Sequence, residues 1–450
     1  MAEIKKILIA NRGEIVQRAI RTIREMGKKS VAVYSAGDKN ASYLKHADEA
    51  VCIGGVKSID SYLNIPALIT AAEMTGCDAI FPGYGFLSEN QDFVEICRLH
   101  NIKFIGPSVE VMEKMADKSK AKDEMIKAGV PVVPGSNGAV HSLEEGRKVA
   151  EEIGYPIMAK ASAGGGGRGM RLVNTAEDFD QLFMAASSEA LAAFGDGTMY
   201  LERFINNPRH IEVQVIGDSH GNAIHIGERD CSLQRRHQKV IEESPAILLN
   251  DETRAHLHDV AVKATKFLKY EGAGTFEFLA DDKQNIYFME MNTRLQVEHP
   301  VSEMVSGLDI IEWMIKVAQG ERLPEQDKIK FRGHAIEVRI TAEDPNSFLP
   351  SPGKVTQWMV PGGRNVRVDS HLYAGYVVPP YYDSMVGKLI VWGRDRNKAI
   401  NIMKRALNEF EVEGIRTTIP FHKKMMENED FISNNYDTKY LENYKSLDDI

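Results

Sequence analysis

The sequence predicts a mixed α/β and α+β protein, and two patterns carry this prediction. Over about the first 110 residues, short apolar runs alternate with helical patterns, which is typical of an open, mostly parallel sheet. From His210 to Asn292, strand patterns follow one another through Gly, Asp and Asn turns, which is typical of an antiparallel sheet. We therefore expect a parallel domain followed by an antiparallel one.

The N-terminal part contains four strand patterns and two helical ones. The helical stretch after the first strand places Ile15, Ala19 and Ile23 on one face. In chain order we expect a strand at 5–11, a helix around 15–26, strands at 29–35 and 78–83, a helix at 91–101 and a strand at 103–108. No G-x-G-x-x-G motif follows the first strand, so the sequence disfavours a dinucleotide-binding dehydrogenase.

The middle of the chain begins after a Pro-rich break. A charged helical stretch at 118–130 leads into PVVPGS at 131–136, which predicts a domain boundary near residue 131. Residues 155–205 have the pattern of a small lobe of strands and one helix. Beyond the antiparallel sheet we expect a strand at 333–344, Gly- and Pro-rich β structure to about residue 393, and a helix at 397–410.

The composition excludes several classes of protein. A chain of 450 residues is long for one core, so about two to four lobes are expected. The net charge of −9 gives no basic face for nucleic acid, and no apolar run approaches the roughly 20 residues of a membrane span. The cysteines form no CxxC pair and suit a reducing compartment, so we expect a cytoplasmic protein. They are Cys52, Cys77, Cys97 and Cys231.

A glycine-rich hairpin is predicted at KASAGGGGRGMRLV, residues 160–173. It is not a P-loop, because GK[ST] is missing and the segment after the glycines is strand-like. Strand, glycine loop and strand together can close over a polyphosphate and donate backbone N–H groups to it. Lys160 and Arg168 favour this interpretation over a flexible surface linker.

Two acids and an amide interrupt the apolar strands of the next predicted hairpin. Glu277 lies on its first strand, and Glu290 and Asn292 lie on its second. Buried carboxylates usually meet a cation, and oxygen ligands of this kind suit Mg²⁺. Salt bridges to neighbouring Arg or Lys are the alternative. Because these residues are expected beside the glycine loop, we favour a metal site over salt bridges.

The segment EMNTRLQVEHP, residues 290–300, carries a polar side chain at every second position. If the strand continues, these side chains share one face. They are Glu290, Asn292, Arg294, Gln296 and Glu298. A guanidinium suits a small oxyanion, and a neighbouring carboxylate can take its proton.

The segment RDCSLQRRHQKV, residues 229–240, adds cationic groups, with His237 and Lys239 on one face if extended. Taken alone, the segment would be interpreted as a solvated basic loop. With the acids and the glycine hairpin, it indicates phosphoryl transfer from ATP·Mg²⁺ to a small anionic acceptor.

The chain resembles biotin carboxylase, the ATP-grasp component of biotin-dependent carboxylases, from about Lys5 to the 440s. The blocks that carry the resemblance are LIANRGEI, FPGYGFLSEN, KASAGGGGRGM, RDCSLQRRHQKVIEESP, EMNTRLQVEHPVSE, FLPSPG and YYDSMVGKLI. The resemblance implies an ATP-grasp fold with a Rossmann-like (pre-ATP-grasp) domain at 1–115 and an ATP-grasp domain at 116–325. It also implies a mobile lid at about 131–204 and a β-rich C-terminal domain at 330–446.

The resemblance also implies roles for individual residues. Contacts to ATP fall on Lys118, Lys160, Gly166, Gly167, Glu202, Arg203, Phe204, Ile205, His210, Gln234, His237, Glu277 and Glu290. Metal ligands would be Glu277, Glu290 and Asn292, and bicarbonate would meet Lys239, Arg294, Gln296, Val297 and Glu298. Glu298 would be the base, Arg294 would steady the biotin enolate, and Arg339 and Tyr84 would bind biotin.

The implied reaction uses ATP, Mg²⁺ or Mn²⁺ and bicarbonate to form carboxyphosphate, which then carboxylates biotin. No Met-Lys-Met occurs in the sequence, so we expect the biotin on a separate carrier protein. The implied partners are that carrier, carboxyltransferase subunits and a second copy of the chain. Acetyl-CoA carboxylase of fatty acid synthesis is the expected setting, and a two-subunit pyruvate carboxylase is the alternative.

Two positions depart from the pattern of many family members, Phe81 where His is common and Ala163 where Gly is common. Two other functions are alternatives to this one. Another ATP-grasp ligase would share Lys160, Glu277, Glu290 and Asn292 but lack RLQVEHP beside RRHQKV. A silent nucleotide-binding module would lack an acid or the base, whereas all are present here.

Overall fold

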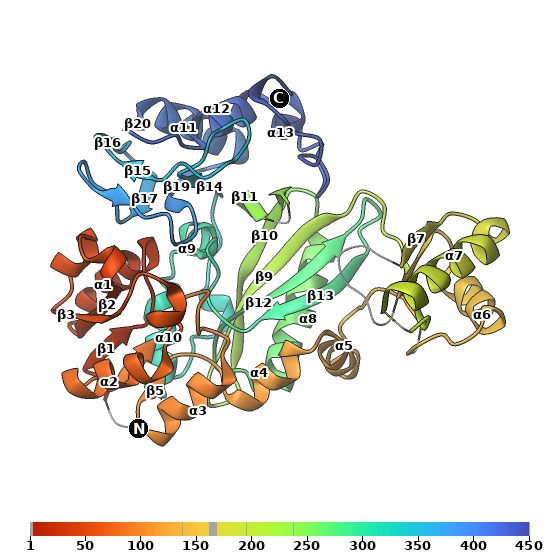
Figure 1. Ribbon diagram of the computed structural model, residues 1–450, viewed down its shortest axis with the longest axis horizontal. Helices are drawn as coiled ribbons and strands as arrows, with labels where there is room; N and C mark the ends of the chain where they lie inside the picture. Colours follow the sequence, from red (N-terminus) through yellow and green to blue (C-terminus); the bar gives the residue numbers. More distant parts are fainter. Residues whose placement is uncertain (1–2, 137, 162–168, 195, 237, 450) are drawn as a thin grey trace. The chain divides into compact units, whose positions relative to one another are not determined.

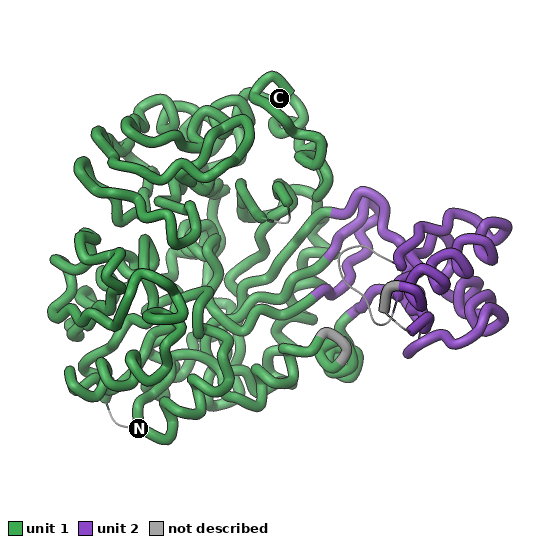
Figure 2. Tube along the Cα trace, viewed as in Figure 1, with its two compact units in different colours: residues 1–130, 209–278, 290–450 green, residues 131–208, 279–289 purple. Residues whose placement is uncertain are grey.

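The computed structural model describes residues 3–136, 138–161, 169–194, 196–236 and 238–449. The chain forms two compact units (Figure 2). Unit 1 comprises residues 1–130, 209–278 and 290–450, and unit 2 comprises residues 131–208 and 279–289. Unit 2 thus begins at the Pro-rich break, where Pro131 follows the last helix of the N-terminal region.

The N-terminal part of unit 1 contains a five-stranded sheet in the order β3-β2-β1-β4-β5 (Figure 1). All its strand pairs are parallel, which confirms the prediction. The strands are β1 Lys6–Ile9, β2 Lys29–Ser35, β3 Glu49–Gly54, β4 Ala79–Phe81 and β5 Lys103–Phe104. The helices are α1 Glu14–Glu25, α2 Ile65–Thr75, α3 Gln91–Leu99, α4 Val109–Ala116 and α5 Lys118–Lys127.

Local sequence explains where these helices begin and end. Ile15, Ala19 and Ile23 of α1 are buried, as their spacing predicts. The side chain of Asn64 caps α2 by accepting a hydrogen bond from the Ala67 N–H, and Gly76 ends the helix in the left-handed region. The resulting parallel sheet packs its apolar strands between helices, and Phe81 is fully buried in that core.

The central sheet of the molecule has eight strands in the order β13-β12-β9-β10-β11-β14-β19-β17. The pairs β9–β10 and β10–β11 are antiparallel, as predicted for residues 210–292. The pairs β11–β14, β14–β19 and β19–β17 continue the antiparallel order beyond the predicted region. The strands are β9 Arg209–Gly217, β10 Ala223–Arg235, β11 Gln238–Ser244, β12 Gly272–Ala280, β13 Ile286–Asn292, β14 His334–Thr341, β17 Val366–Ser370 and β19 Met385–Gly393. The accompanying helices are α8 Asp251–Phe267, α9 His299–Ser306 and α10 Ile310–Ala318.

The C-terminal part of unit 1 adds small β ladders and helices. β15 Gly353–Lys354 pairs with β18 Val377–Val378, and β16 Gln357–Met359 pairs with β20 Glu411–Glu413. The helices are α11 Arg396–Glu409, α12 Ile419–Glu427 and α13 Glu429–Ser433. The helix expected at 397–410 is α11, and its apolar face is buried at Ile400, Met403 and Leu407.

The described residues of unit 2 form a three-stranded antiparallel sheet in the order β7-β6-β8 and two helices. Its strands are β6 Ile157–Ala161, β7 Met170–Val173 and β8 Met199–Arg203, and its helices are α6 Leu143–Ile153 and α7 Ala176–Phe194. Phe179 and Phe183 stack at 5.2 Å between ring centroids in the core of this unit. Helix α6, which precedes the predicted lobe, had not been predicted.

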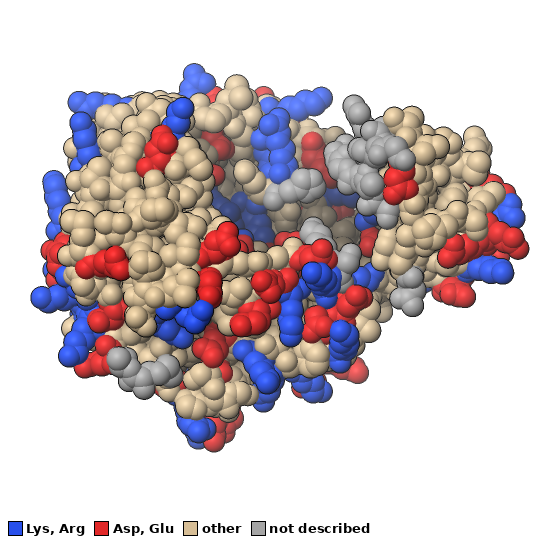
Figure 3. Space-filling view, turned by 60° about the horizontal axis from the view of Figure 1, so that its bottom comes forward, with Lys and Arg blue, Asp and Glu red and all other residues tan. Residues whose placement is uncertain are grey.

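The distribution of surface charge is consistent with the composition, which predicted no basic face. Acidic and basic side chains are interspersed over the face drawn in Figure 3. Among the described residues, no helix is both long enough and apolar enough to span a membrane.

Candidate functional site

The polar segment that follows Glu290 is only partly a strand. β13 ends at Asn292, residues 293–298 have no strand structure, and α9 begins at His299 with Pro300 in its first turn. The prediction of one continuous polar face from Glu290 to Glu298 was therefore wrong beyond Asn292. The side chain of Leu295 is fully buried in the core, and this anchoring turns the chain from strand to helix.

The turn still brings most of these polar groups together, and Glu277 on β12 is their meeting point. The side-chain amides of Asn292 and Gln296 donate to Glu277 Oε1, at 2.9 Å and 3.0 Å. All three side chains are buried. Burial disfavours the charged carboxylate, but Lys239 and His210 outweigh it and hold the pKa of Glu277 well below its usual range.

Lys239 on β11 joins the acids of three different segments. Its Nζ contacts Glu212, Glu277 at 3.0 Å and Glu298 at 2.7 Å. Burial opposes its charge, yet these carboxylates raise the pKa of Lys239 well above its ordinary value. The same ammonium, helped by Arg339, lowers the pKa of Glu298 against the effect of burial. Glu298 is thus held ionised, as a proton acceptor must be.

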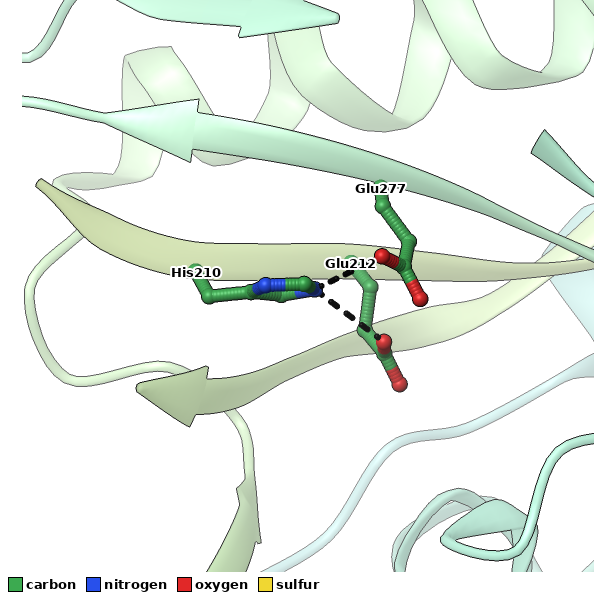
Figure 4. Close-up of side chains that lie close together, drawn as sticks. All are labelled: His210, Glu212 and Glu277. Carbon is green, nitrogen blue, oxygen red and sulfur yellow. Dashed lines mark ion pairs between the residues drawn. The ribbon is translucent and has the colours of Figure 1, made fainter. Parts of the chain in front are cut away.

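His210, Glu212 and Glu277 form a buried cluster on β9 and β12 (Figure 4). His210 Nε2 lies 3.1 Å from Glu277 and 3.7 Å from Glu212, yet it has no hydrogen-bond partner of good geometry among the described residues. Burial works against the imidazolium, but the two carboxylates raise the pKa of His210 to about 9. One donor atom of each residue lies within 4.8 Å of the others, so the cluster could share a cation only after His210 gave up its proton.

The oxygen donors fit a divalent metal of the Mg²⁺ type. Glu277 and Asn292 are adjacent through a hydrogen bond, and Glu290 lies half-buried on the same strand as Asn292, two residues away. Carboxylate and amide oxygens are the ligands that Mg²⁺ takes, with phosphate oxygens and water completing its shell. The ion pair between Glu277 and Lys239 also bears out the salt-bridge alternative for that acid.

Arg294 is oriented from two sides. Its Nε donates to Glu89 at 2.8 Å, and its Nη2 donates to Asn292 Oδ1 at 2.9 Å. Glu89 also accepts from the backbone and the hydroxyl of Thr293, so it fixes the start of the turn. The guanidinium is half-buried, which leaves part of it available to a small anion.

Arg339 on β14 lies between two buried acids. Its Nε donates to Glu242 at 2.6 Å and its Nη2 donates to Glu298 at 3.0 Å. The neighbouring turn is held by Lys388 on β19, whose ammonium donates to the Val297 carbonyl at 2.8 Å and lies 3.3 Å from Glu14.

Tyr84 joins this network, because its hydroxyl donates to Glu14. The predicted biotin contacts Tyr84 and Arg339 both line a cleft of about 700 Å³ within unit 1, together with Lys239 and Val297. Arg235, Arg236, Phe348 and Tyr382 add cationic and aromatic surface to the same cleft. Gln234 lies beside it and meets His210, with 3.1 Å between Nε2 and Nδ1.

Unit 2 holds a separate group of predicted residues. Lys160 on β6 and Glu202 on β8 form an ion pair of 2.6 Å. Arg203 ends β8 with an exposed side chain, and Phe204 and Ile205 follow it half-buried. The predicted residues Gly166, Gly167, Arg168, His237 and Ala163, and the side chain of Lys118, lie outside the described residues.

Several neighbours of the predicted site residues had not been predicted. Glu89, Glu212, Glu242, Glu14 and Lys388 each contact a predicted residue. Lys388 is a fully buried charged residue that interrupts the apolar strand MVGKLIVWG, a signal that was readable in the sequence, whereas Glu242 lies in the polar strand QKVIEES and carries no such signal. Glu89 and Glu14 lie in FLSEN and NRGEI, within two of the blocks that carry the family resemblance.

Family models match almost the whole chain. A biotin carboxylase N-terminal domain model matches residues 3–112, a carbamoyl-phosphate synthase L chain ATP-binding domain model matches residues 117–326, and a biotin carboxylase C-terminal domain model matches residues 337–443. The fold and the site therefore define an ATP-dependent ligase of the ATP-grasp class.

Individual relatives are similar over nearly their full length. A biotin carboxylase of Nostoc is 56% identical and covers 97% of this chain and 98% of its own. A pyruvate carboxylase component of Methanothermobacter thermautotrophicus is 51% identical and covers 98% of this chain and 90% of its own. The chain belongs to the biotin carboxylase family.

Similar solved structures support the same family assignment. The complex of Campylobacter jejuni biotin carboxylase with βγ-ATP is 66% identical, has a TM-score of 0.88 and covers 98% of this chain and 99% of its own. The biotin carboxylase domain dimer of Hydrogenobacter thermophilus 2-oxoglutarate carboxylase, in complex with MgADP, ADP and bicarbonate, is 48% identical. Its TM-score is 0.86, and it covers 98% of each chain.

Proposed function

We propose that this enzyme uses ATP, a divalent metal and bicarbonate to carboxylate biotin on a separate carrier protein. One observation carries the proposal: Lys239 joins the expected metal ligand Glu277 to the expected base Glu298 within one buried cluster. Metal-bound nucleotide and a small anion can thereby meet at adjacent groups of the same protein. The relatives solved with βγ-ATP, and with MgADP and bicarbonate, support this assignment.

The residues divide the work by their chemistry. Glu277, Glu290 and Asn292 would hold the metal ion, which neutralises charge on the phosphates. Lys239 and Arg294 would hold bicarbonate, with the Gln296 amide and the Val297 backbone fixing its orientation. Glu298 would take its proton, because its carboxylate is buried, ionised and next to the Lys239 ammonium.

The second half of the reaction would occur in the cleft. Arg339 would bind the ureido oxygen of biotin, and Tyr84 would contact its ring system. Arg294 would then stabilise the negative charge that develops on biotin.

Purified enzyme with Mg²⁺ and free biotin should hydrolyse ATP only when bicarbonate is present. ATP hydrolysis at the same rate with and without bicarbonate would contradict the proposal.

Unit 2 supplies the nucleotide lid in this proposal. Lys160 and the segment from Glu202 to Ile205 would contact ATP, together with the glycine segment and Lys118, His210, Gln234 and His237. The working domains would be 1–115, 116–325 with the lid at about 131–204, and 330–446. Amide exchange in peptides covering β6 and β7 should slow on addition of ATP·Mg²⁺, and equal exchange in both states would contradict a lid.

The final carboxyl acceptor belongs to a partner. Acetyl-CoA carboxylase in the cytoplasm is the proposed setting, with biotin carrier and carboxyltransferase proteins as partners and a homodimer as the assembly. The Methanothermobacter relative favours pyruvate as a second candidate. Affinity purification of the tagged chain from its own cells should recover the transferase, whose acceptor decides between the two.

A further inference from the structure

Arg339 has a second partner to which no role has been assigned. Its side chain is 18% exposed and lines the cleft, while its Nε donates at 2.6 Å to Glu242, a residue of β11. The side chain of Glu242 is 0% exposed. Glu242 is absent from the cleft lining. It therefore does not touch a substrate in the cleft directly, and its hydrogen-bond partner at the cleft is Arg339.

A buried carboxylate that lacks hydrogen-bond partners is energetically unfavourable. Glu242 Oε2 has no hydrogen-bond partner among the described residues, and Glu337, directly opposite it in the β11–β14 ladder, has none for either carboxylate oxygen. Among the described residues, the guanidinium of Arg339 is the one ion-pair partner of Glu242. Buried, half-satisfied acids destabilise a fold, so their presence beside a reactive site calls for a functional explanation.

The contacts fix the plane of the guanidinium. With Nε bonded to Glu242 and Nη2 bonded to Glu298, Arg339 is held at two of its three nitrogens. Because the five N–H donors of arginine lie in one rigid plane, these two contacts also fix the orientation of Nη1. The Glu298 contact would be lost if Glu298 turned to another ligand, whereas Glu242 is fully buried and outside the cleft lining.

We propose that Glu242 is a positioning residue for Arg339, which holds the guanidinium toward biotin while Glu298 engages bicarbonate. This inference rests on the proposed function. Removing Glu242 should leave nucleotide and bicarbonate chemistry intact and should weaken only the step in which Arg339 meets biotin.

The test compares Glu242→Leu and Glu242→Gln with Glu243→Gln. Leucine removes the acceptor at similar volume, and glutamine retains a weaker one. Glu243 is the next residue of β11, equally buried, and pairs with Arg396 and His334 instead. It controls for loss of a buried ion pair on this strand.

Glu242→Leu should lower kcat/KM for free biotin by about 10- to 100-fold, the range for a lost charge-assisted hydrogen bond, and Glu242→Gln should lose less. ATP affinity and bicarbonate-dependent ATP hydrolysis without biotin should stay within about two-fold, and Glu243→Gln should preserve all three. In an Arg339→Ala background, Glu242→Leu should cause no further loss. Additive loss, or equal loss of all activities, would overturn the proposal.

A crystal structure of Glu242→Leu, which has no acceptor for Arg339 Nε, provides a readout that does not depend on activity. The Arg339 guanidinium should be rotated or disordered, and an unchanged side chain would overturn the inference. If the wild-type enzyme itself shows no bicarbonate-dependent ATP hydrolysis, the proposed function fails, whereas the orientation of Arg339 still tests the role of Glu242.

Discussion

The ammonium of Lys239 lies 2.7 Å from the Glu298 carboxylate and 3.0 Å from that of Glu277. A single cation thus joins the expected proton acceptor to the expected metal ligand. Each acid can therefore be tested separately, because neutralising one leaves the ion pair between Lys239 and the other in place.

Glu298→Gln should abolish bicarbonate-dependent ATP hydrolysis while ATP still binds. The change removes the base but leaves Glu277 and Asn292 in place, and loss of a positioned general base typically lowers the rate by about 10²- to 10⁴-fold. Steady-state kinetics and equilibrium ATP binding measure the two effects. Near-normal turnover would remove Glu298 from this role.

Glu277→Gln should raise the Mg²⁺ concentration needed for half-maximal ATP hydrolysis by at least about ten-fold, because it removes a charged metal ligand. A Mg²⁺ titration of wild type and variant measures the change. Chelation by EDTA should stop the wild-type reaction, and added Mg²⁺ should restore it. An unchanged Mg²⁺ requirement in the variant would place the metal elsewhere.

Lys160→Met should raise KM for ATP with a smaller effect on the affinity for bicarbonate. Lys160 forms an ion pair with Glu202 inside unit 2, at the residues expected to contact nucleotide. Arg147→Met is the matched control, because Arg147 pairs with Asp180 on the exposed surface of the same unit. An equal rise of KM in both variants would indicate a general effect on unit 2.

Stability should fall as the solution is acidified below about pH 6.5, and His225 should contribute to this fall. Burial, followed by the neighbouring His258, lowers the pKa of His225 from its ordinary value of 6.5 to about 3. Between these values the unfolded chain binds a proton that the folded chain does not, so stability decreases with falling pH by up to about 1.4 kcal/mol per pH unit for this group.

His225→Asn should reduce the slope of the unfolding free energy against pH by the equivalent of about one proton. Asparagine retains an acceptor for the Gly227 N–H, which bonds to His225 Nδ1 at 3.3 Å. Urea unfolding at several values between pH 7.5 and pH 5 measures the slope, so a constant offset in stability does not affect the comparison. Identical slopes would show that His225 titrates normally. His371, with its pKa lowered by burial to about 3, should contribute in the same direction.

The sequence predicted the elements well where one local pattern dominated. The parallel strands around Ile7 and Val31 are continuous apolar runs, and α1 has a clear helical period, so burial and local propensity agree. The segment from Arg294 to Glu298 was different. Its alternation is that of a strand, but burial of Leu295 and the start of α9 at His299 imposed a turn.

The partners of the site residues were less accessible to prediction than the residues themselves. Arg294 could be recognised from its own segment, but Glu89, more than two hundred positions away, contacts it only through the fold. The same holds for Lys388 and the Val297 carbonyl. Periodicity reports which face a side chain occupies, not which distant segment packs against that face.

The shared eight-stranded sheet limits how this enzyme can be divided or recombined. β11 belongs to the region of the ATP-binding family model, whereas most of its neighbour β14 falls in that of the C-terminal model. A cut near residue 330 would strip Ile241–Ser244 of their ladder and create an open edge prone to aggregation. Chimaeras between relatives should therefore exchange β11, β14 and β19 together, because the boundary between the family models runs through a single hydrogen-bonded layer.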